Sequence, residues 1–138
     1  MAITALAGPL TNFLIAFFTV PVYLLLYRLL VHLSDGGQVA PFVFQLVLYT
    51  YYFFVILHSV NLGLGVFNLI PLPPLDGSRI LLVFLPPKYY FGLMRYERYI
   101  SLALILILFF GSRFDILSRV SNTIGGVMES LWLLIPGL

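Results

Sequence analysis

The chain has 138 residues, of which 62% are hydrophobic and 9% are charged, against soluble averages of about half and about a quarter. A water-soluble domain of this size could not bury so much apolar surface, so the composition predicts a single membrane domain over residues 1–138, with the lipid bilayer as its solvent. The formal net charge of +2 is too small to indicate nucleic acid as a partner, and the absence of cysteine excludes disulfides and thiolate metal sites.

Two long apolar segments come first in the sequence, and both are predicted to be membrane-spanning helices. The first covers residues 10–33 and the second residues 39–69. A straight helix over the uncharged run from Val39 to Ile70 would reach about 48 Å, against a hydrocarbon core of about 30 Å. We therefore expect the second helix to be tilted or interrupted. The residues expected to loosen it are Asn61, Gly63 and Gly65.

A proline-rich element with a carboxylate ends the second segment, and it reads Asn68-Leu-Ile-Pro-Leu-Pro-Pro-Leu-Asp-Gly77. Prolines remove backbone donors and stop a helix, and irregular backbone at membrane depth is tolerated only inside protein or beside a water-filled cavity. An ionisable side chain at this depth, here Asp76, indicates a functional site. The expected fold class is an all-α, multi-pass transmembrane helical bundle in which a proline-broken helix carries the Asp-Gly element.

Two further helical segments follow this element. Residues 90–111 are predicted to span the membrane, and residues 114–135 to form an interfacial or half-inserted amphipathic helix whose apolar side chains recur at helical spacing. Positive charges gather between the Asp-Gly element and the third span. By the positive-inside tendency they place the element towards the cytoplasmic side of a cell membrane. These basic residues are Arg79, Lys88, Arg95 and Arg98.

The residues alone leave more than one role open for Asp76. A carboxylate oxygen suits zinc, which in catalytic sites takes three protein ligands and a water. An aspartate in this place could also cap a helix that starts near Gly77, or pair with Arg79. The usual source of the other ligands is a helical HExxH motif, which the sequence lacks, since neither His32 nor His58 is followed by glutamate. We expect His58 to be a packed or hydrogen-bonded histidine rather than a ligand.

At these residues the sequence resembles the site-2 protease family of intramembrane zinc metalloproteases. The first match is to the family's Asn-x-x-Pro-x-Pro-x-x-Asp-Gly element, present here as Asn68, Pro71, Pro73, Asp76 and Gly77. A second match is Ala7-Gly8-Pro9 with Asn12, which resembles the start of the helix that follows the family's HExxH region. The two elements occur in the family's order, and the resemblance covers essentially the whole chain.

The resemblance implies zinc-dependent cleavage of peptide bonds in transmembrane or membrane-associated protein substrates. Asp76 would be the carboxylate zinc ligand. Asn68 would lie near the substrate-binding cleft, Pro71 and Pro73 would shape that cleft, and Gly77 would permit its close turn. In the family, a zinc-bound water activated by the glutamate of HExxH attacks the peptide bond.

The sequence departs from the family pattern in one respect, because two of the three expected zinc ligands and the general base are missing from it. We therefore expect it to be the C-terminal part of a longer protease domain and to be inactive alone. One alternative is a non-catalytic relative that binds transmembrane segments without cutting them. A weaker alternative is a transporter subunit, since broken helices with a midplane carboxylate also occur in transporters.

Overall fold

The computed structural model describes residues 2–36, 40–79, 87–110 and 115–135. The described chain is helical, which confirms the all-α part of the predicted fold class. Residues 39, 111 and 114, where expected segments begin or end, lie outside the described ranges. The helices are α1 (Ala2–Asp35), α2 (Pro41–Asn68), α4 (Pro87–Phe110) and α5 (Asp115–Leu133), and residues 76–79 add a helical turn.

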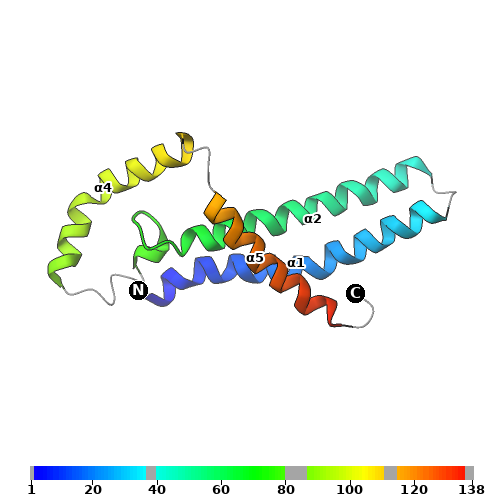
Figure 1. Cartoon of the computed structure of the whole chain (residues 1–138), viewed down its shortest axis with the longest axis horizontal. Coiled ribbons are helices and arrows are strands. Elements are labelled where there is room, and N and C mark those ends of the chain that lie inside the picture. Colours follow the sequence, from blue (N-terminus) through cyan, green and yellow to red (C-terminus); the bar gives the residue numbers. More distant parts are fainter. Residues whose placement is uncertain (1, 37–39, 80–86, 111–114, 136–138) are drawn as a thin grey trace.

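Helices α1 and α2 form a long antiparallel hairpin (Figure 1). Each holds a segment long and apolar enough to cross a membrane, Leu6–Asp35 and Pro41–Asn68, with mean hydropathies of 2.1 and 1.6. At 1.5 Å per residue these segments reach about 45 Å and about 42 Å, more than the hydrocarbon core of about 30 Å. Helices of this length fit a bilayer when they tilt.

The loosening expected near the end of the second segment does not occur. Helix α2 runs without interruption through Asn61, Gly63 and Gly65 and ends at Asn68. The Asn61 side chain is accommodated within the helix because its amide donates to the Leu57 carbonyl, 2.8 Å away. Gly65 instead allows close packing, since a Cβ atom there would lie 3.2–3.3 Å from the Phe13 ring of α1.

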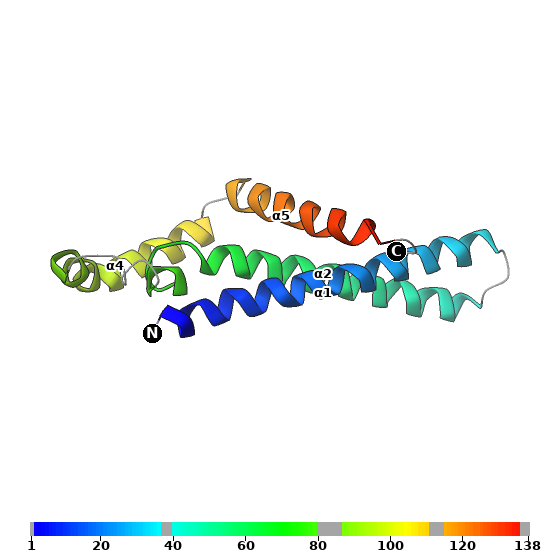
Figure 2. The same cartoon turned by 90° about the horizontal axis from the view of Figure 1, so that it is seen from below.

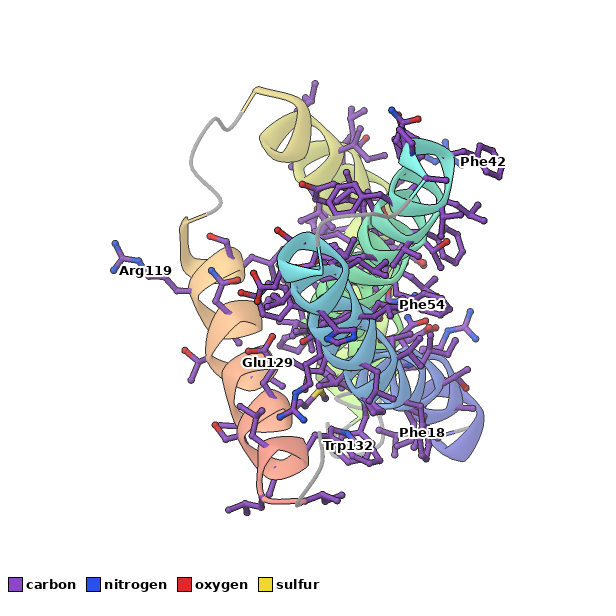
Figure 3. The ribbon with its side chains drawn as sticks, turned by 90° about the vertical axis from the view of Figure 1, so that its right-hand side faces the viewer. Phe18, Phe42, Phe54, Arg119, Glu129 and Trp132 are labelled. Carbon is purple, nitrogen blue, oxygen red and sulfur yellow. The ribbon has the colours of Figure 1, made fainter. Side chains whose placement is uncertain are left out.

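The hairpin has a narrow interior and an apolar exterior. Large apolar side chains such as Phe42, Tyr49 and Phe18 are 73%, 68% and 60% exposed, and Figure 3 shows Phe18 and Phe42 on the outside of the two helices. An apolar exterior of this extent suits lipid neighbours better than water. The buried apolar residues include Pro9, Ala16, Val20, Tyr23, Leu30, Leu62, Val66 and Leu75.

Helix α5 crosses one face of the hairpin and packs against both α1 and α2 (Figures 1 and 2). Its buried Gly125 permits a close approach, because a Cβ atom there would lie 3.1 Å from Leu62 Cδ2 and 3.3 Å from His58 Nε2. The Trp132 indole donates to the Phe17 carbonyl at 3.0 Å. These contacts fix α5 over the middle of the hairpin.

Part of the apolar stripe predicted for this last helix is exposed rather than packed on the hairpin. Val127, Leu131 and Leu134 are 57%, 52% and 77% exposed. The side that packs on α1 carries Glu129 and Trp132, while Arg119 points away (Figure 3). The helix therefore exposes polar side chains such as Arg119 together with part of its apolar stripe, while Glu129 and Trp132 bond to α1.

Helix α4 lies beyond the end of the hairpin at which α2 ends (Figure 1). Its described side chains, residues 95–106, are mostly exposed, including Arg95 and Arg98. Lys88 lies in the part of α4 whose side chains are outside the described set. The prediction that this helix spans the membrane stays a prediction.

Candidate functional site

The candidate site begins where proline stops α2. The last turn tightens, with the Leu69 amide donating to the Val66 carbonyl at 3.2 Å and the Ile70 amide to the Phe67 carbonyl at 3.1 Å. Pro71 has no amide hydrogen and cannot extend the helix. The chain therefore leaves the helix axis and turns back.

Short backbone hydrogen bonds organise the returning segment. The Leu75 amide donates to the Leu72 carbonyl at 2.9 Å, and the Ser78 amide and hydroxyl both donate to the Leu75 carbonyl, at 3.0 and 2.7 Å. Leu75 and Ser78 are buried. The segment is thus a compact turn that brings residues 76–79 against the end of α2.

Gly77 is the tightest point of this turn. A Cβ atom at this buried position would lie 2.5 Å from the carbonyl oxygens of both Leu69 and Ile70. No side chain fits such a gap unless the backbone moves. The expected role of Gly77 in permitting a close turn therefore has a steric reason. The Asp-Gly pair packs directly against the backbone of Leu69 and Ile70, the two residues that follow α2.

Asp76 faces the first turns of α1. A Cβ atom built on Gly8 would lie 3.1 Å from Asp76 Oδ2, so the two elements singled out in the sequence, Ala7-Gly8-Pro9 and Asp76-Gly77, meet in space. Asp76 itself is half-buried. Glycine at position 8 leaves room beside the carboxylate oxygen.

The other predicted site residues lie along the same turn. Asn68 is the last residue of α2 and is half-buried, Pro71 is exposed, and Pro73 is buried. The peptide bond between Pro73 and Pro74 is cis. The five residues of the element thus run from the last residue of α2 through the turn to Asp76 and Gly77.

The competing roles for Asp76 find no contact in the described chain. Asp76 is the first residue of the helical turn 76–79, yet no cap hydrogen bond from its side chain and no ion pair with the exposed Arg79 occur among the described residues.

His58 does not approach Asp76. It is buried, its Nδ1 lies 2.9 Å from the Ala16 carbonyl oxygen, and its ring stands edge-on to Tyr23 with centroids 5.5 Å apart. It lies ten residues before Asn68 on α2, which is about 15 Å along the helix. The expectation of a packed, hydrogen-bonded histidine is confirmed.

The described residues do not fit a complete zinc site. No group of three His, Cys, Asp or Glu side chains that could hold a metal occurs among them, whereas a catalytic zinc takes three protein ligands. Asp76 offers one. A zinc ion could be held here only if further ligands came from residues other than those described.

One polar group was missed by the sequence reasoning. The Tyr23 hydroxyl on α1 donates to a Glu129 carboxylate oxygen on α5, and both residues line a cavity of about 310 Å³ between α5 and the hairpin. The signal available in the sequence was an ionisable residue off the apolar stripe of the last helix. Its partner lies 106 residues away, and no local pattern identifies it.

Comparison with known proteins gives two matches. The sequence model of peptidase family M50 matches residues 43–111, half of the chain, a range that contains the whole Asn68–Gly77 element. The chain is also 36% identical over 107 residues to the protein named "Putative zinc metalloprotease YwhC" from Bacillus subtilis (strain 168). That alignment covers 78% of this chain and 44% of the relative.

The chain thus spans less than half the length of the relative that it matches. No solved structure matches it. The two sequence matches agree with each other, since the family model and the relative both indicate a metalloprotease of this family. On this evidence the chain belongs to peptidase family M50, the site-2 protease family.

Proposed function

We propose that this chain is the part of an intramembrane zinc metalloprotease that supplies the carboxylate zinc ligand, Asp76, and the bend that shapes the substrate cleft. The observation that carries the proposal is that Asp76 lies beside Gly8 of the Ala7-Gly8-Pro9 element. A Cβ atom built on Gly8 would lie 3.1 Å from Asp76 Oδ2. Two separate family elements meet at one carboxylate, and no described side chain forms a hydrogen bond or ion pair with it.

The remaining ligands and the general base would come from an HExxH segment of a longer protein. The alignment covers 44% of the relative, so a protein of that kind has room for such a segment. A bound zinc would polarise the scissile carbonyl and activate water. Asn68, Pro71 and Pro73 would border the cleft, and the substrates would be transmembrane or membrane-associated polypeptides in a cell membrane.

The first experiment is to read the coding sequence upstream of Met1 and to measure the intact mass of the native protein. An in-frame HExxH, with a mass above 15.6 kDa, is expected. A native protein of 15.6 kDa without that motif would overturn the protease proposal for this polypeptide and favour a relative that binds membrane segments without cutting them.

The second experiment tests Asp76 in the native protein, reconstituted in proteoliposomes with a transmembrane peptide. We expect Asp76→Asn to lower zinc content below one per protein and to reduce cleavage by at least about a hundredfold, since one of three ligands loses its charge. Removal of zinc with a chelator should abolish cleavage, and added zinc should restore it.

The matched control is Asp35→Asn, which removes the same charge from an exposed residue at the other end of α1. It should leave zinc content and cleavage unchanged. Cleavage that survives both Asp76→Asn and chelation would contradict the proposal. Ion flux through proteoliposomes that depends on Asp76, without cleavage, would support a transporter instead.

A further inference from the structure

A second polar site lies at the middle of the hairpin, away from Asp76. The cavity of about 310 Å³ between α5 and the hairpin is of the size at which small-molecule pockets begin. It lies beside Tyr23 of Leu6–Asp35 and beside Val55 and His58 of Pro41–Asn68, near the centre of both candidate spans. The polar residues that line it are Tyr23, Tyr51, His58, Ser59, Ser121, Asn122 and Glu129.

The formal charge on the lining of this cavity is negative. Among the described lining residues Glu129 alone carries a formal charge. The Tyr23 hydroxyl donates to one of its oxygens, which leaves a second oxygen able to accept. A carboxylate at membrane depth is costly, and such residues face a protein interior or cavity and pair with a partner there.

The other lining groups also suit a hydrogen-bond donor. Ser121 Oγ is buried and has no hydrogen-bond partner among the described residues, and its lone pairs can accept. The rings of Tyr23 and Tyr51 border the same space, and aromatic faces attract cations. An ammonium group has three donors and no acceptor, which complements this lining.

We propose that this cavity is a subsite for a basic side chain, lysine or arginine, of the membrane-embedded polypeptide that binds at the Asp76 bend. This proposal rests on the proposed function for the identity of the ligand. The depth of the cavity favours a side chain over a lipid amine, because lipid headgroups lie at the ends of a span, about 15 Å from its centre.

The position of the cavity sets the register of the substrate. Gly8, beside Asp76, and Ala16, beside His58, are eight residues apart on α1, or about 12 Å. An extended peptide advances about 3.3 Å per residue. The basic residue would therefore lie about four or more positions from the bond held near Asp76.

The test is a binding measurement that needs no cleavage. The full chain, purified in detergent micelles, is titrated with a fluorescent transmembrane peptide that carries one lysine, and with a matched peptide that carries norleucine there. We expect the lysine peptide to bind about tenfold more tightly or better, since pairing a desolvated charge is worth at least that factor. The quantity compared is the ratio of the two dissociation constants, norleucine peptide over lysine peptide. Glu129→Gln should bring this ratio close to one.

Two variants complete the design. Glu97→Gln removes the same charge from an exposed position on α4 and should keep the ratio. Gly126 lines the cavity, and a Cβ atom there meets nothing within 4 Å, so Gly126→Leu should fold and block the cavity. If Glu129→Gln fails to fold, the loss of the ratio in Gly126→Leu decides the question.

A ratio near one in the wild-type chain, or an unchanged ratio in both cavity variants, would overturn the proposal. Retention of phosphatidylethanolamine from mixed micelles that depends on Glu129, with a ratio near one, would assign the cavity to a lipid amine and overturn it too. A tenfold ratio without cleavage by the native protein would count against the proposed protease function alone.

Discussion

At the scale of single residues, Gly77 is the position at which the bend leaves least room. A Cβ atom would lie 2.5 Å from two carbonyl oxygens, a distance at which backbone must move. Those oxygens belong to Leu69 and Ile70, directly after α2, so a shift of the backbone at Gly77 would also move its neighbour Asp76. Position 77 thus couples the packing of the turn to the placement of the carboxylate.

We predict that Gly77→Ala destabilises the protein by about 1–3 kcal/mol, the range for overpacking a close-packed site. The measurement is unfolding in mixed micelles by a denaturing detergent. Gly63→Ala is the matched control, because a Cβ atom on Gly63 meets nothing within 4 Å and alanine favours a helix. Equal effects of the two substitutions would refute the steric argument.

Asp76 shows what the sequence could predict about the candidate site. Its residue type and the prolines before it indicate a polar bend from local rules alone, since proline stops helices wherever it occurs in their interior. The contact with Gly8 could be anticipated only from the family resemblance. No local rule brings a residue of the first helix next to one that lies 68 positions later in the chain.

At the scale of elements, α5 is held by a few polar contacts within an apolar surface. The Tyr23 hydroxyl bonds to Glu129, the Trp132 indole bonds to the Phe17 carbonyl, and the rings of Phe17 and Trp132 lie 5.1 Å apart. In lipid there is no hydrophobic driving force between helices, so close packing and interhelical hydrogen bonds hold them together. The hydrogen bonds and the close approach at Gly125 therefore have a large share in positioning α5.

We predict that a double-mutant cycle of Tyr23→Phe and Glu129→Ala, which removes both the donor and the acceptor, gives a coupling free energy of about 0.6 to 1.7 kcal/mol, from the mean to the largest value for such pairs in a membrane protein. Stability is again measured by unfolding in mixed micelles. A parallel cycle of Tyr23→Phe with Glu97→Ala should give no coupling, because Glu97 is exposed on α4. No coupling in the first cycle would mean that other contacts dock α5.

The helices themselves followed from the sequence, and their mutual arrangement did not. A long apolar segment predicts a membrane helix because backbone N–H and C=O groups inside the bilayer must form their hydrogen bonds within the segment. The same apolar stretch says nothing about which face meets which neighbour when lipid and protein are equally apolar. The stripe on α5 could therefore be recognised from the sequence. The side of α5 that packs on α1 could not, because its partners Tyr23 and Phe17 lie 106 and 115 residues away in the chain.

At the scale of the whole molecule, the hairpin separates two ends with different charge. The bend at Asp76 lies at the end where α1 starts and α2 stops, and Asp35 closes α1 at the opposite end. Arg79, Arg95 and Arg98 follow the bend and are exposed. Basic residues are retained on the cytoplasmic side of a membrane, so this asymmetry predicts the orientation of the chain.

The sequence contains no cysteine, so single cysteines report the orientation without interference. We predict that Asp35→Cys reacts with a membrane-impermeant maleimide in intact cells, whereas Arg98→Cys reacts only after the cells are permeabilised. The reverse pattern would place Asp76 on the outer side and contradict the charge argument. Reaction of both in intact cells would contradict a membrane-spanning hairpin. Reaction of neither before permeabilisation would mean that both ends lie inside, in which case α1 does not cross the membrane.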